Sequence, residues 1–285
     1  FFKQKTAYEI KECDWSSDVC SSDLPYSTRN GLRIYYEVSG EGPPIVLVHA
    51  NPFDHRLWMY QTARWSAFHA IVTVDIRGYG RSDKPTTPFT LVDMAKDVIG
   101  VMDNLAIDRA VIGGCSVGSG IALVIGLDHP ARAQALVLVG GASRPSVNVS
   151  ARVQGYAGDV RAYQQQHLRE CTAPGFGDHK LGGWILSMFN ERADTLSGAS
   201  IGQIFRARGS LNVQDRLDAM QPPTIVVNGE HDMSFDAGVE TAKLIPGAVH
   251  AVIKDAGHAC QIENPADFDA AVLPFLARHG LWGGG

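Results

Sequence analysis

Short runs of apolar residues recur along the chain, with amphipathic segments between them. Nearly every position in these runs is apolar, which is typical of parallel strands that helices cover on both faces. The runs are residues 45–48, 71–74, 110–112, 136–139, 225–227 and 251–253. A further segment, 30–39, begins with an Asn-Gly turn signal and continues with strand-forming residues. The alternation predicts an open α/β fold with a mostly parallel sheet.

Helical periodicity fills several gaps between these runs. Residues 91–105 place apolar side chains three and four positions apart, which predicts an amphipathic helix. A second helix is predicted from Asn264-Pro265 onwards, because proline is favoured at a helix start. The uncharged stretch 110–127 is long enough to span a membrane, but five glycines and two serines interrupt it. We therefore interpret it as a strand, a tight turn and a buried helix.

The strand pattern stops between residues 144 and 222, where the chain is mostly compatible with helix. Within it, an apolar cluster at helical spacing consists of Trp184, Ile185, Met188 and Phe189. The cluster could pack on the core, or it could be the underside of a lid that faces a substrate pocket. We predict the second, with residues 144–222 inserted as a helical lid into a core made of 25–143 and 223–285.

Composition narrows the possible functions. The 285 residues are 45% apolar, which excludes a generally disordered chain. The formal net charge is −5 and no basic block is present, so we expect neither nucleic acid nor a membrane surface as a partner. We expect a monomer or homodimer in the cytoplasm.

The first 24 residues resemble a conceptual translation of a short-read sequencing adapter. They contain FFKQKTAYEI and DWSSDVCSSDL, in that order, and we predict that they are not native protein. Without them the chain has 261 residues and three cysteines. Because the segment carries three lysines and five acidic residues, its removal changes the net charge from −5 to −3. A signal peptide upstream of this junction would also be missing from the sequence.

One motif directly suggests chemistry. Gly114-Cys115-Ser116-Val117-Gly118 matches G-x-S-x-G and lies between a predicted strand and a predicted helix. Such a sharp turn needs small neighbours, and it raises the serine hydroxyl above the sheet. A phosphate-binding loop would need a lysine and a serine or threonine after the last glycine, and both are missing. Ser116 is therefore the candidate nucleophile.

With this motif the chain resembles the α/β-hydrolase fold family. The resemblance extends over most of residues 30–276 and rests on further motifs in order: His49-Ala50-Asn51-Pro52, Asp75-Ile76-Arg77-Gly78 with Ser82, Gly229-Glu230-His231-Asp232, and Gly257-His258 with Glu263-Asn264-Pro265. The resemblance implies a Ser-His-Asp triad on a sheet that helices flank. It also implies that His49, Asp75, Arg77 and Ser82 are structural.

A serine hydroxyl needs a base, and the base needs an acid that orients it. His258 stands where the family places its base, and the order Ser116, Asp232, His258 matches the family. Glu230 is the rival to Asp232 as the acid. The backbone N–H groups of Asn51 and Val117 are expected to form the oxyanion hole.

Two features of the chain bear on the details of this site. Ala50 departs from the commoner His-Gly pattern, which leaves the geometry of the oxyanion loop open. Cys115, Cys171 and Cys260 are expected to be buried and inert. No metal-binding motif occurs, so no metal and no cofactor are expected.

We predict hydrolysis of a small-molecule ester or lactone through an acyl-enzyme. The lid segment resembles that of 3-oxoadipate enol-lactonases. Carbon–carbon bond hydrolases and cofactor-free perhydrolases are alternatives with the same triad. Proline iminopeptidases are another alternative, and their acidic lid groups would have to be Glu170, Glu191 or Asp194. A small-molecule receptor on the same fold is the alternative outside enzymes.

Overall fold

The computed structural model describes residues 25–146 and 148–283. The prediction about residues 1–24 lies outside them. The described strands are β1 (Tyr26–Arg29), β2 (Leu32–Ser39), β3 (Pro44–Val48), β4 (Ala70–Val74), β5 (Ala110–Cys115), β6 (Ala133–Val139), β7 (Thr224–Gly229) and β8 (Val249–Ile253). Every apolar run of the sequence falls on one of them. The turn at Asn30-Gly31 joins β1 to β2, and both residues have positive φ.

The strands form one sheet in the order β1-β2-β4-β3-β5-β6-β7-β8. The pairs β1–β2 and β2–β4 are antiparallel, and the other pairs are parallel. The predicted, mostly parallel sheet is therefore confirmed. Parallel strands point the same way, so the loops after β3, β5, β7 and β8 emerge at the same edge. The loops that carry the candidate site residues all lie there.

Helices join and cover these strands. The α-helices are α1 (Met59–Trp65), α2 (Leu91–Asn104), α3 (Val117–Asp128), α4 (Val149–Ala157), α5 (Val160–Glu170), α6 (Lys180–Asn190), α7 (Gly198–Gly209), α8 (Phe235–Leu244), α9 (Cys260–Glu263) and α10 (Pro265–Arg278). Short 3-10 helices are η1 (His55–Trp58), η2 (Pro130–Arg132), η3 (Phe176–Asp178), η4 (Ala193–Thr195) and η5 (Gln214–Ala219). The stretch 110–127 divides into β5 and α3, and none of the described helices combines the length and the apolar character needed to cross a membrane.

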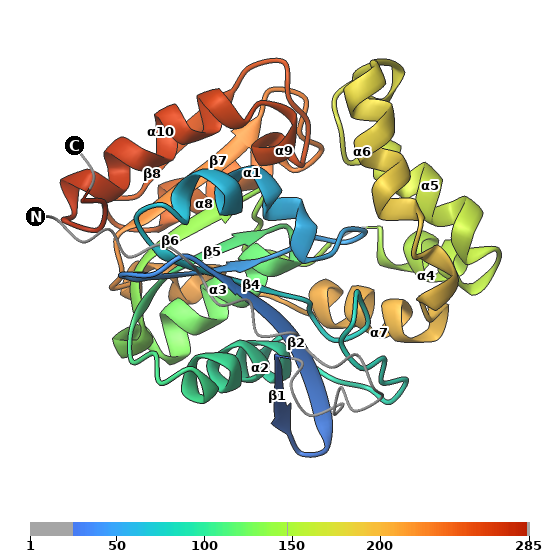
Figure 1. The fold of residues 1–285 in the computed structure, drawn as a ribbon, viewed down its shortest axis with the longest axis horizontal. Coiled ribbons are helices and arrows are strands. Elements are labelled where there is room, and N and C mark those ends of the chain that lie inside the picture. Colours follow the sequence, from blue (N-terminus) through green and yellow to red (C-terminus); the bar gives the residue numbers. More distant parts are fainter. Residues whose placement is uncertain (1–24, 147, 284–285) are drawn as a thin grey trace, which may run out of the picture.

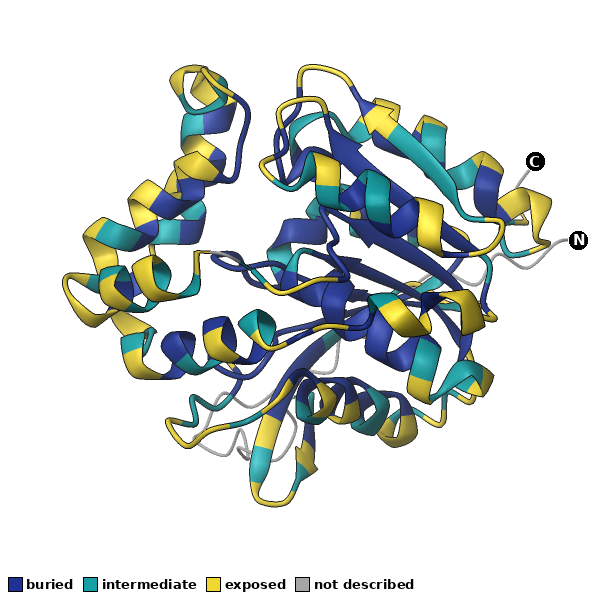
Figure 2. Cartoon of the chain, turned by 180° about the vertical axis from the view of Figure 1, so that it is seen from behind, coloured by how far each residue is buried: buried dark blue, intermediate teal, exposed yellow. Residues whose placement is uncertain are grey.

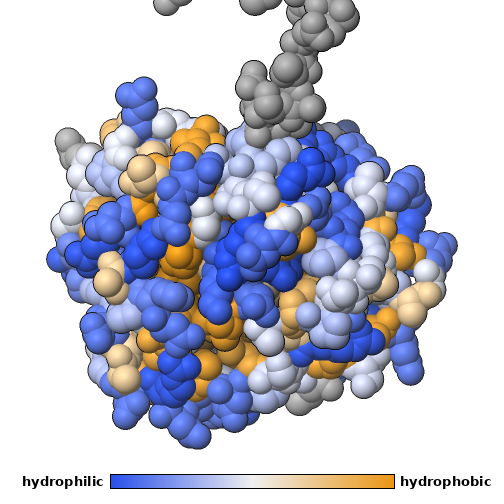
Figure 3. Space-filling view, turned by 90° about the horizontal axis from the view of Figure 1, so that it is seen from below, coloured by the Kyte–Doolittle hydropathy of each residue, from blue (hydrophilic) through white to orange (hydrophobic). Residues whose placement is uncertain are grey.

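The sheet separates two apolar clusters. One lies against α2, α3 and α8, and the other lies against α1, α9 and α10. Figure 1 shows α1 and α10 on one face of the sheet and α2 and α3 on the other. The central strands are dark blue in Figure 2 because both of their faces are covered, whereas β1, β2 and β8, at or next to the edges of the sheet, include intermediate and exposed residues. On the face seen in Figure 3, hydrophilic residues cover most of the surface, and apolar residues form a band and scattered small patches.

The chain between β6 and β7 is helical, as the sequence indicated. It forms α4 to α7, which stand beside the sheet in Figure 1. Different helices of the insertion attach to different clusters. Tyr156 and Phe205 join the cluster of α2 and α3, whereas Ile185 and Phe189 join the cluster of α1 and α10. This helical insertion therefore spans the edge of the sheet where the strands end.

Candidate active site

Ser116 lies on a sharp turn between β5 and α3. Its φ of 55° and ψ of −110° are rare for a residue with a side chain, and such backbone strain costs roughly 1–3 kcal/mol. The glycines of the motif are required by close contacts. A Cβ at Gly114 would lie 2.2 Å from the carbonyl oxygen of Gly118, and a Cβ at Gly118 would lie 2.3 Å from that of Val48. The packing of α3 onto β3 and β5 thus explains the G-x-S-x-G pattern.

Asp232 and His258 meet across two loops. Asp232 follows β7 and His258 follows β8, and both are buried. Oδ1 of Asp232 lies 2.6 Å from Nδ1 of His258. A carboxylate can only accept, so Nδ1 carries the proton and Nε2 keeps its lone pair. This tautomer is the one that a general base needs.

The two groups shift each other's titration. Burial acts to raise the pKa of Asp232, but the charge and hydrogen bond of His258, together with other donors, lower it to about 2. Burial acts to lower the pKa of His258, but the charge and hydrogen bond of Asp232 outweigh it, so the pKa of His258 is raised above 6.5. Asp232 is therefore ionised whenever His258 is neutral.

Two further residues hold Asp232, and the sequence analysis missed both. Asn228 donates from Nδ2 to Oδ2 of Asp232 at 2.7 Å. The hydroxyl of Ser234 lies 2.9 Å from Oδ1 of Asp232, and its backbone N–H donates to the same oxygen at 2.8 Å. Asn228 is a fully buried polar residue at the end of the apolar strand β7, which is a signal the sequence offered. Glu230, the rival acid, is exposed and accepts from the backbone N–H of Asp255.

The loop after β3 brings Asn51 to the same cavity as Ser116. Among the described backbone hydrogen bonds, none uses the N–H of Asn51 or of Val117 as its donor. Both N–H groups therefore lack a backbone acceptor among the described residues. Ala50 is not among the residues with positive φ, so its methyl group causes no backbone strain. His49 lies behind this loop, where it accepts from the N–H of Ile76 at 3.0 Å, which agrees with the structural role expected of it.

A cavity of about 420 Å³ contains Ser116 and His258. This volume is in the range of small-molecule sites. The other described lining residues are Asn51, Gly140, Ala142, Arg144, Pro145, Ser146, Asn148, Arg152, His167, Cys171, Phe205, Arg208, Met233, Ser234 and Ala237. The helical insertion thus contributes α4, α5 and α7 to the lining.

Trp184, Met188 and Phe189 are not among these described lining residues, contrary to our prediction for them. Trp184 is 58% exposed, and Phe189 packs edge-on against Phe53. Helical spacing showed correctly that the residues share a region of α6, but α6 packs on α5 and not over Ser116. The pocket assignment of these three side chains is therefore corrected.

Comparison with known proteins agrees with this geometry. Residues 43–265 match the family model described as alpha/beta hydrolase fold. The chain belongs to the α/β-hydrolase fold family. The solved structure of an N-acyl homoserine lactone degrading enzyme is 31% identical, with a TM-score of 0.76, and the match covers 88% of this chain and all of that one.

Two other relatives of this α/β hydrolase carry different activities in their names. The enol-lactonase from Burkholderia xenovorans LB400 is 26% identical, with a TM-score of 0.83, over 89% of this chain and all of that one. The 2-hydroxymuconate semialdehyde hydrolase of Pseudomonas sp. (strain CF600) is 28% identical over 87% of this chain and 92% of its own length. These matches identify the chain as a hydrolase of the esterase or lactonase type.

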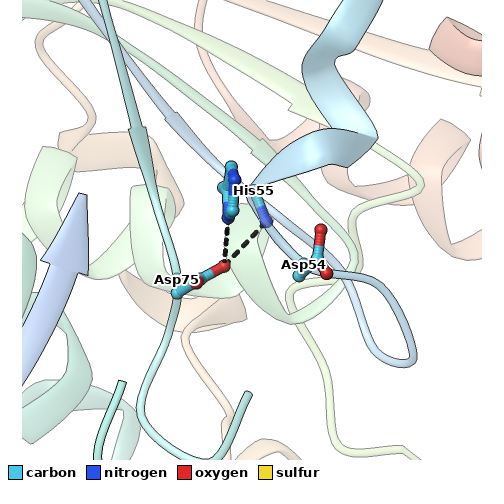
Figure 4. Close-up of side chains that lie close together, drawn as sticks. All are labelled: Asp54, His55 and Asp75. Carbon is cyan, nitrogen blue, oxygen red and sulfur yellow. Dashed lines mark hydrogen bonds and ion pairs between the residues drawn. The ribbon is translucent and has the colours of Figure 1, made fainter. Parts of the chain in front are cut away.

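The loop after β4 braces the hydrolase site from behind. The backbone N–H and Nδ1 of His55 both contact Oδ1 of Asp75 at 2.8 Å (Figure 4). Oδ2 of Asp75 accepts from the N–H of Arg81, and Asp54 is held by the guanidinium of Arg56. These bonds use the atoms that a metal ion would need. The cluster in Figure 4 is therefore a buried ion pair between His55 and Asp75 that fixes the loop.

Two other residues of this loop have the structural role that the resemblance implies. Ser82 donates to the carbonyl oxygen of Asp75 and accepts from the N–H of Tyr35. Arg77 forms a two-point ion pair with Asp97 of α2, with both N–O distances at 2.7 Å. The loop is thereby attached to the sheet and to α2.

The three described cysteines are free, buried thiols. Burial raises the pKa of Cys115, Cys171 and Cys260. Thiols with a raised pKa carry little thiolate at neutral pH, so they are weak nucleophiles. The expectation that they are buried is confirmed, and Cys115 is a poor competitor to Ser116.

Glu263 links the loop of His258 to the helical insertion. Its Oε1 accepts from the N–H of Gly257 at 2.9 Å, and its Oε2 accepts from the N–H of Ala173 at 2.6 Å. Burial raises the pKa of Glu263 to about 7, against the opposing effect of these two donors. The negative charge of Glu263 also contributes to the raised pKa of His258.

Replacing Glu263 with glutamine should therefore move the acid limb of the pH–rate profile to lower pH. Activity needs neutral His258, so kcat/KM falls as the pH drops below the pKa of His258. Because the pKa of Glu263 is about 7, part of the population carries the negative charge near neutral pH. Removing that partial charge disfavours the protonated imidazole and lowers the pKa of His258. The measurement is kcat/KM for an uncharged ester between pH 5 and 9. The matched control is Glu41→Gln, which removes an exposed carboxylate in the β2–β3 turn. An unmoved acid limb in Glu263→Gln would contradict the electrostatic link.

Proposed function

We propose that this protein is a serine hydrolase that cleaves a carboxylic ester or lactone of a small molecule through an acyl-enzyme. The observation that carries the proposal is the 2.6 Å contact between Asp232 and His258, because His258 lines the same cavity as Ser116 on its strained turn. A nucleophile, a base with the right tautomer and an orienting acid together suit acyl transfer.

In the proposed mechanism, the hydroxyl oxygen of Ser116 attacks the carbonyl carbon while Nε2 of His258 takes its proton. The N–H groups of Asn51 and Val117 bind the oxyanion of the tetrahedral intermediate, and each such donor contributes roughly 10²–10³ in rate. His258 then gives the proton to the leaving alcohol, and the acyl group stays on Ser116. Water repeats the sequence and releases the acid. Asp232 stays ionised throughout and stabilises the imidazolium.

The helical insertion has a part in this proposal. We propose residues 144–222 as a lid domain on a core of residues 25–143 and 223–285. The described insertion residues that line the cavity support this, among them Arg152 of α4, His167 of α5 and Phe205 of α7. The selection of substrates would then depend on α4, α5 and α7, while the chemistry depends on the core loops.

Carbon–carbon bond hydrolysis is a second candidate. The 28% identity to the 2-hydroxymuconate semialdehyde hydrolase favours it, and the same triad would serve. The leaving group of an ester is an alkoxide, which needs one proton from His258. A carbon leaving group needs protonation at carbon, which demands a substrate that can tautomerise. Assays with simple esters and with a vinylogous diketone therefore separate the two activities.

Fluorophosphonate labelling tests the proposed function directly. We expect a single adduct on Ser116, mapped by mass spectrometry, together with repeated turnover of short p-nitrophenyl esters. Labelling on Cys115 or another residue, with Ser116 unmodified, would contradict the nucleophile assignment. One slow turnover that leaves a lasting covalent product would instead support a small-molecule receptor.

A further inference from the structure

Positive charge dominates the described lining of the cavity that holds Ser116 and His258. Arg144, Arg152 and Arg208 line it, and none of the described lining residues is an aspartate or a glutamate. Asp232 lies behind His258 and is neutralised by the contact with it when His258 is protonated. The cavity therefore differs from the apolar slot that a neutral acyl chain would fill.

Two of the three arginines already have carboxylate partners. Nη1 of Arg144 lies 3.2 Å from Oε2 of Glu240 on α8. Nη1 of Arg152 lies 2.5 Å from Oε2 of Glu170 on α5. These pairs neutralise most of the positive charge that the two arginines bring to the cavity.

Arg208 is different. Near the end of α7, it donates from Nη1 to the carbonyl oxygen of Arg144 and from Nη2 to that of Ala142, both at 2.9 Å. Within residues 25–146 and 148–283, no carboxylate forms an ion pair with it. Carbonyl dipoles orient the guanidinium, but they do not cancel its charge. Burial lowers the pKa of Arg208 to about 10, so the group is still protonated at neutral pH.

His167 adds no charge to the cavity. Gln164 donates from Nε2 to the carbonyl oxygen of Pro52, so its Oε1 is the atom that accepts from the hydroxyl of Tyr156. The oxygen of Tyr156 then accepts from Nδ1 of His167 at 2.9 Å. Burial and the charge of Arg152 lower the pKa of His167 well below 6.5, which keeps the imidazole neutral. Arg208 is thus the cation of the described lining that lacks a counter-charge.

We propose that the substrate is an ester or lactone that carries a carboxylate, and that Arg208 binds this carboxylate. This inference rests on the proposed function, because it names the substrate class of the same site. A half-buried cation without a counter-charge is costly, and an anionic ligand reduces that cost. The planar guanidinium presents paired N–H donors that match the two oxygens of a carboxylate. The backbone bonds to Arg144 and Ala142 hold the fork in place before the substrate arrives.

The test compares esters that differ only in charge. Mono-p-nitrophenyl adipate and p-nitrophenyl hexanoate have the same chain length, and only the first has a free carboxylate on the acyl part. 4-Carboxyphenyl hexanoate and its methyl ester place the charge on the leaving group instead. We expect the wild type to favour one anionic ester over its neutral partner at least tenfold in kcat/KM.

Arg208→Gln should lower kcat/KM for that anionic ester by about 10- to 100-fold, which corresponds to one hydrogen bond to a charged group. The neutral partner should change less than threefold. Arg208→Lys keeps the charge but loses the fork, so it should fall between these values. The matched control is Arg206→Gln on the same helix, because Arg206 is exposed and absent from the described lining. This control should match the wild type with both esters.

A measurement on the unmodified chain avoids any folding defect of the variants. Adipate should inhibit turnover of p-nitrophenyl hexanoate competitively, and dimethyl adipate should inhibit it at least tenfold more weakly. Equal inhibition by both, or equal losses for anionic and neutral esters in Arg208→Gln, would overturn the inference. If either of these results is found while Ser116 is labelled and neutral esters turn over, the proposed function stands and only the role of Arg208 fails. If Ser116 is neither labelled nor required, the proposed function itself fails.

Discussion

Ser116→Ala is expected to lower kcat for p-nitrophenyl esters by about 10⁶-fold, the size of loss that follows removal of a nucleophile from a triad. The methyl group cannot attack a carbonyl, and the oxyanion donors that remain cannot replace covalent catalysis. Assays of the purified variant over long times measure the residual rate. Because Ser116 holds a strained backbone with or without its hydroxyl, thermal stability should change little.

Ser119→Ala is the matched control for this substitution. Ser119 lies one turn further along α3, and its buried hydroxyl has no hydrogen-bond partner among the described residues. Removing it should leave kcat within about twofold and should leave stability unchanged or slightly raised, since an unpaired buried hydroxyl is costly. A Ser116→Ala variant that keeps a tenth of the wild-type rate would mean that another group attacks the substrate.

Asp232→Asn is expected to lower kcat by about 10⁴-fold, as loss of the orienting carboxylate does in this kind of triad. An asparagine amide that donates to Nδ1 of His258 would place the imidazole proton on Nε2, which is the wrong tautomer for a base. Asn228 and Ser234 would still hold the side chain, so the fold should persist. Steady-state kinetics and a circular dichroism melt separate the two effects.

Glu230→Gln is the comparison that decides between the two candidate acids. Glu230 is exposed, and its Oε2 accepts from the backbone N–H of Asp255. Its substitution should leave kcat within about twofold. A large loss in Glu230→Gln together with an active Asp232→Asn would transfer the role of the acid to Glu230.

Much of the fold was predictable because it depends on local pattern. Consecutive apolar residues mark strands that are covered on both faces, and all such runs became β3 to β8. The elbow was predictable for the same reason, since Gly114 and Gly118 are required by contacts within a few residues of Ser116 and with β3. The glycines therefore encode a close approach of backbones directly in the sequence.

The lid residues show where local pattern stops. The spacing of Trp184, Met188 and Phe189 indicates a helix, but it does not say which surface that helix meets, and in the structure Trp184 is exposed while Phe189 is buried. In the structure α6 packs on α5, and α4, α5 and α7 contribute the insertion residues of the cavity lining. That choice depends on how the helices of the insertion pack together, and α4 and α7, which are in contact, are separated by the whole chain between Ala157 and Gly198.

Periodicity and short motifs in the sequence predict the succession of strands and helices along the chain. They also predict the turn that raises Ser116 and the loops that carry Asp232 and His258. Which charges have partners depends on contacts between distant parts of the chain and became visible in the three-dimensional structure. Arg144 and Arg152 find carboxylates on other helices, whereas Arg208 finds only carbonyl oxygens. Three arginines look alike in a sequence, and their electrostatic roles differ because charge pairing is settled by side chains that meet from distant parts of the chain.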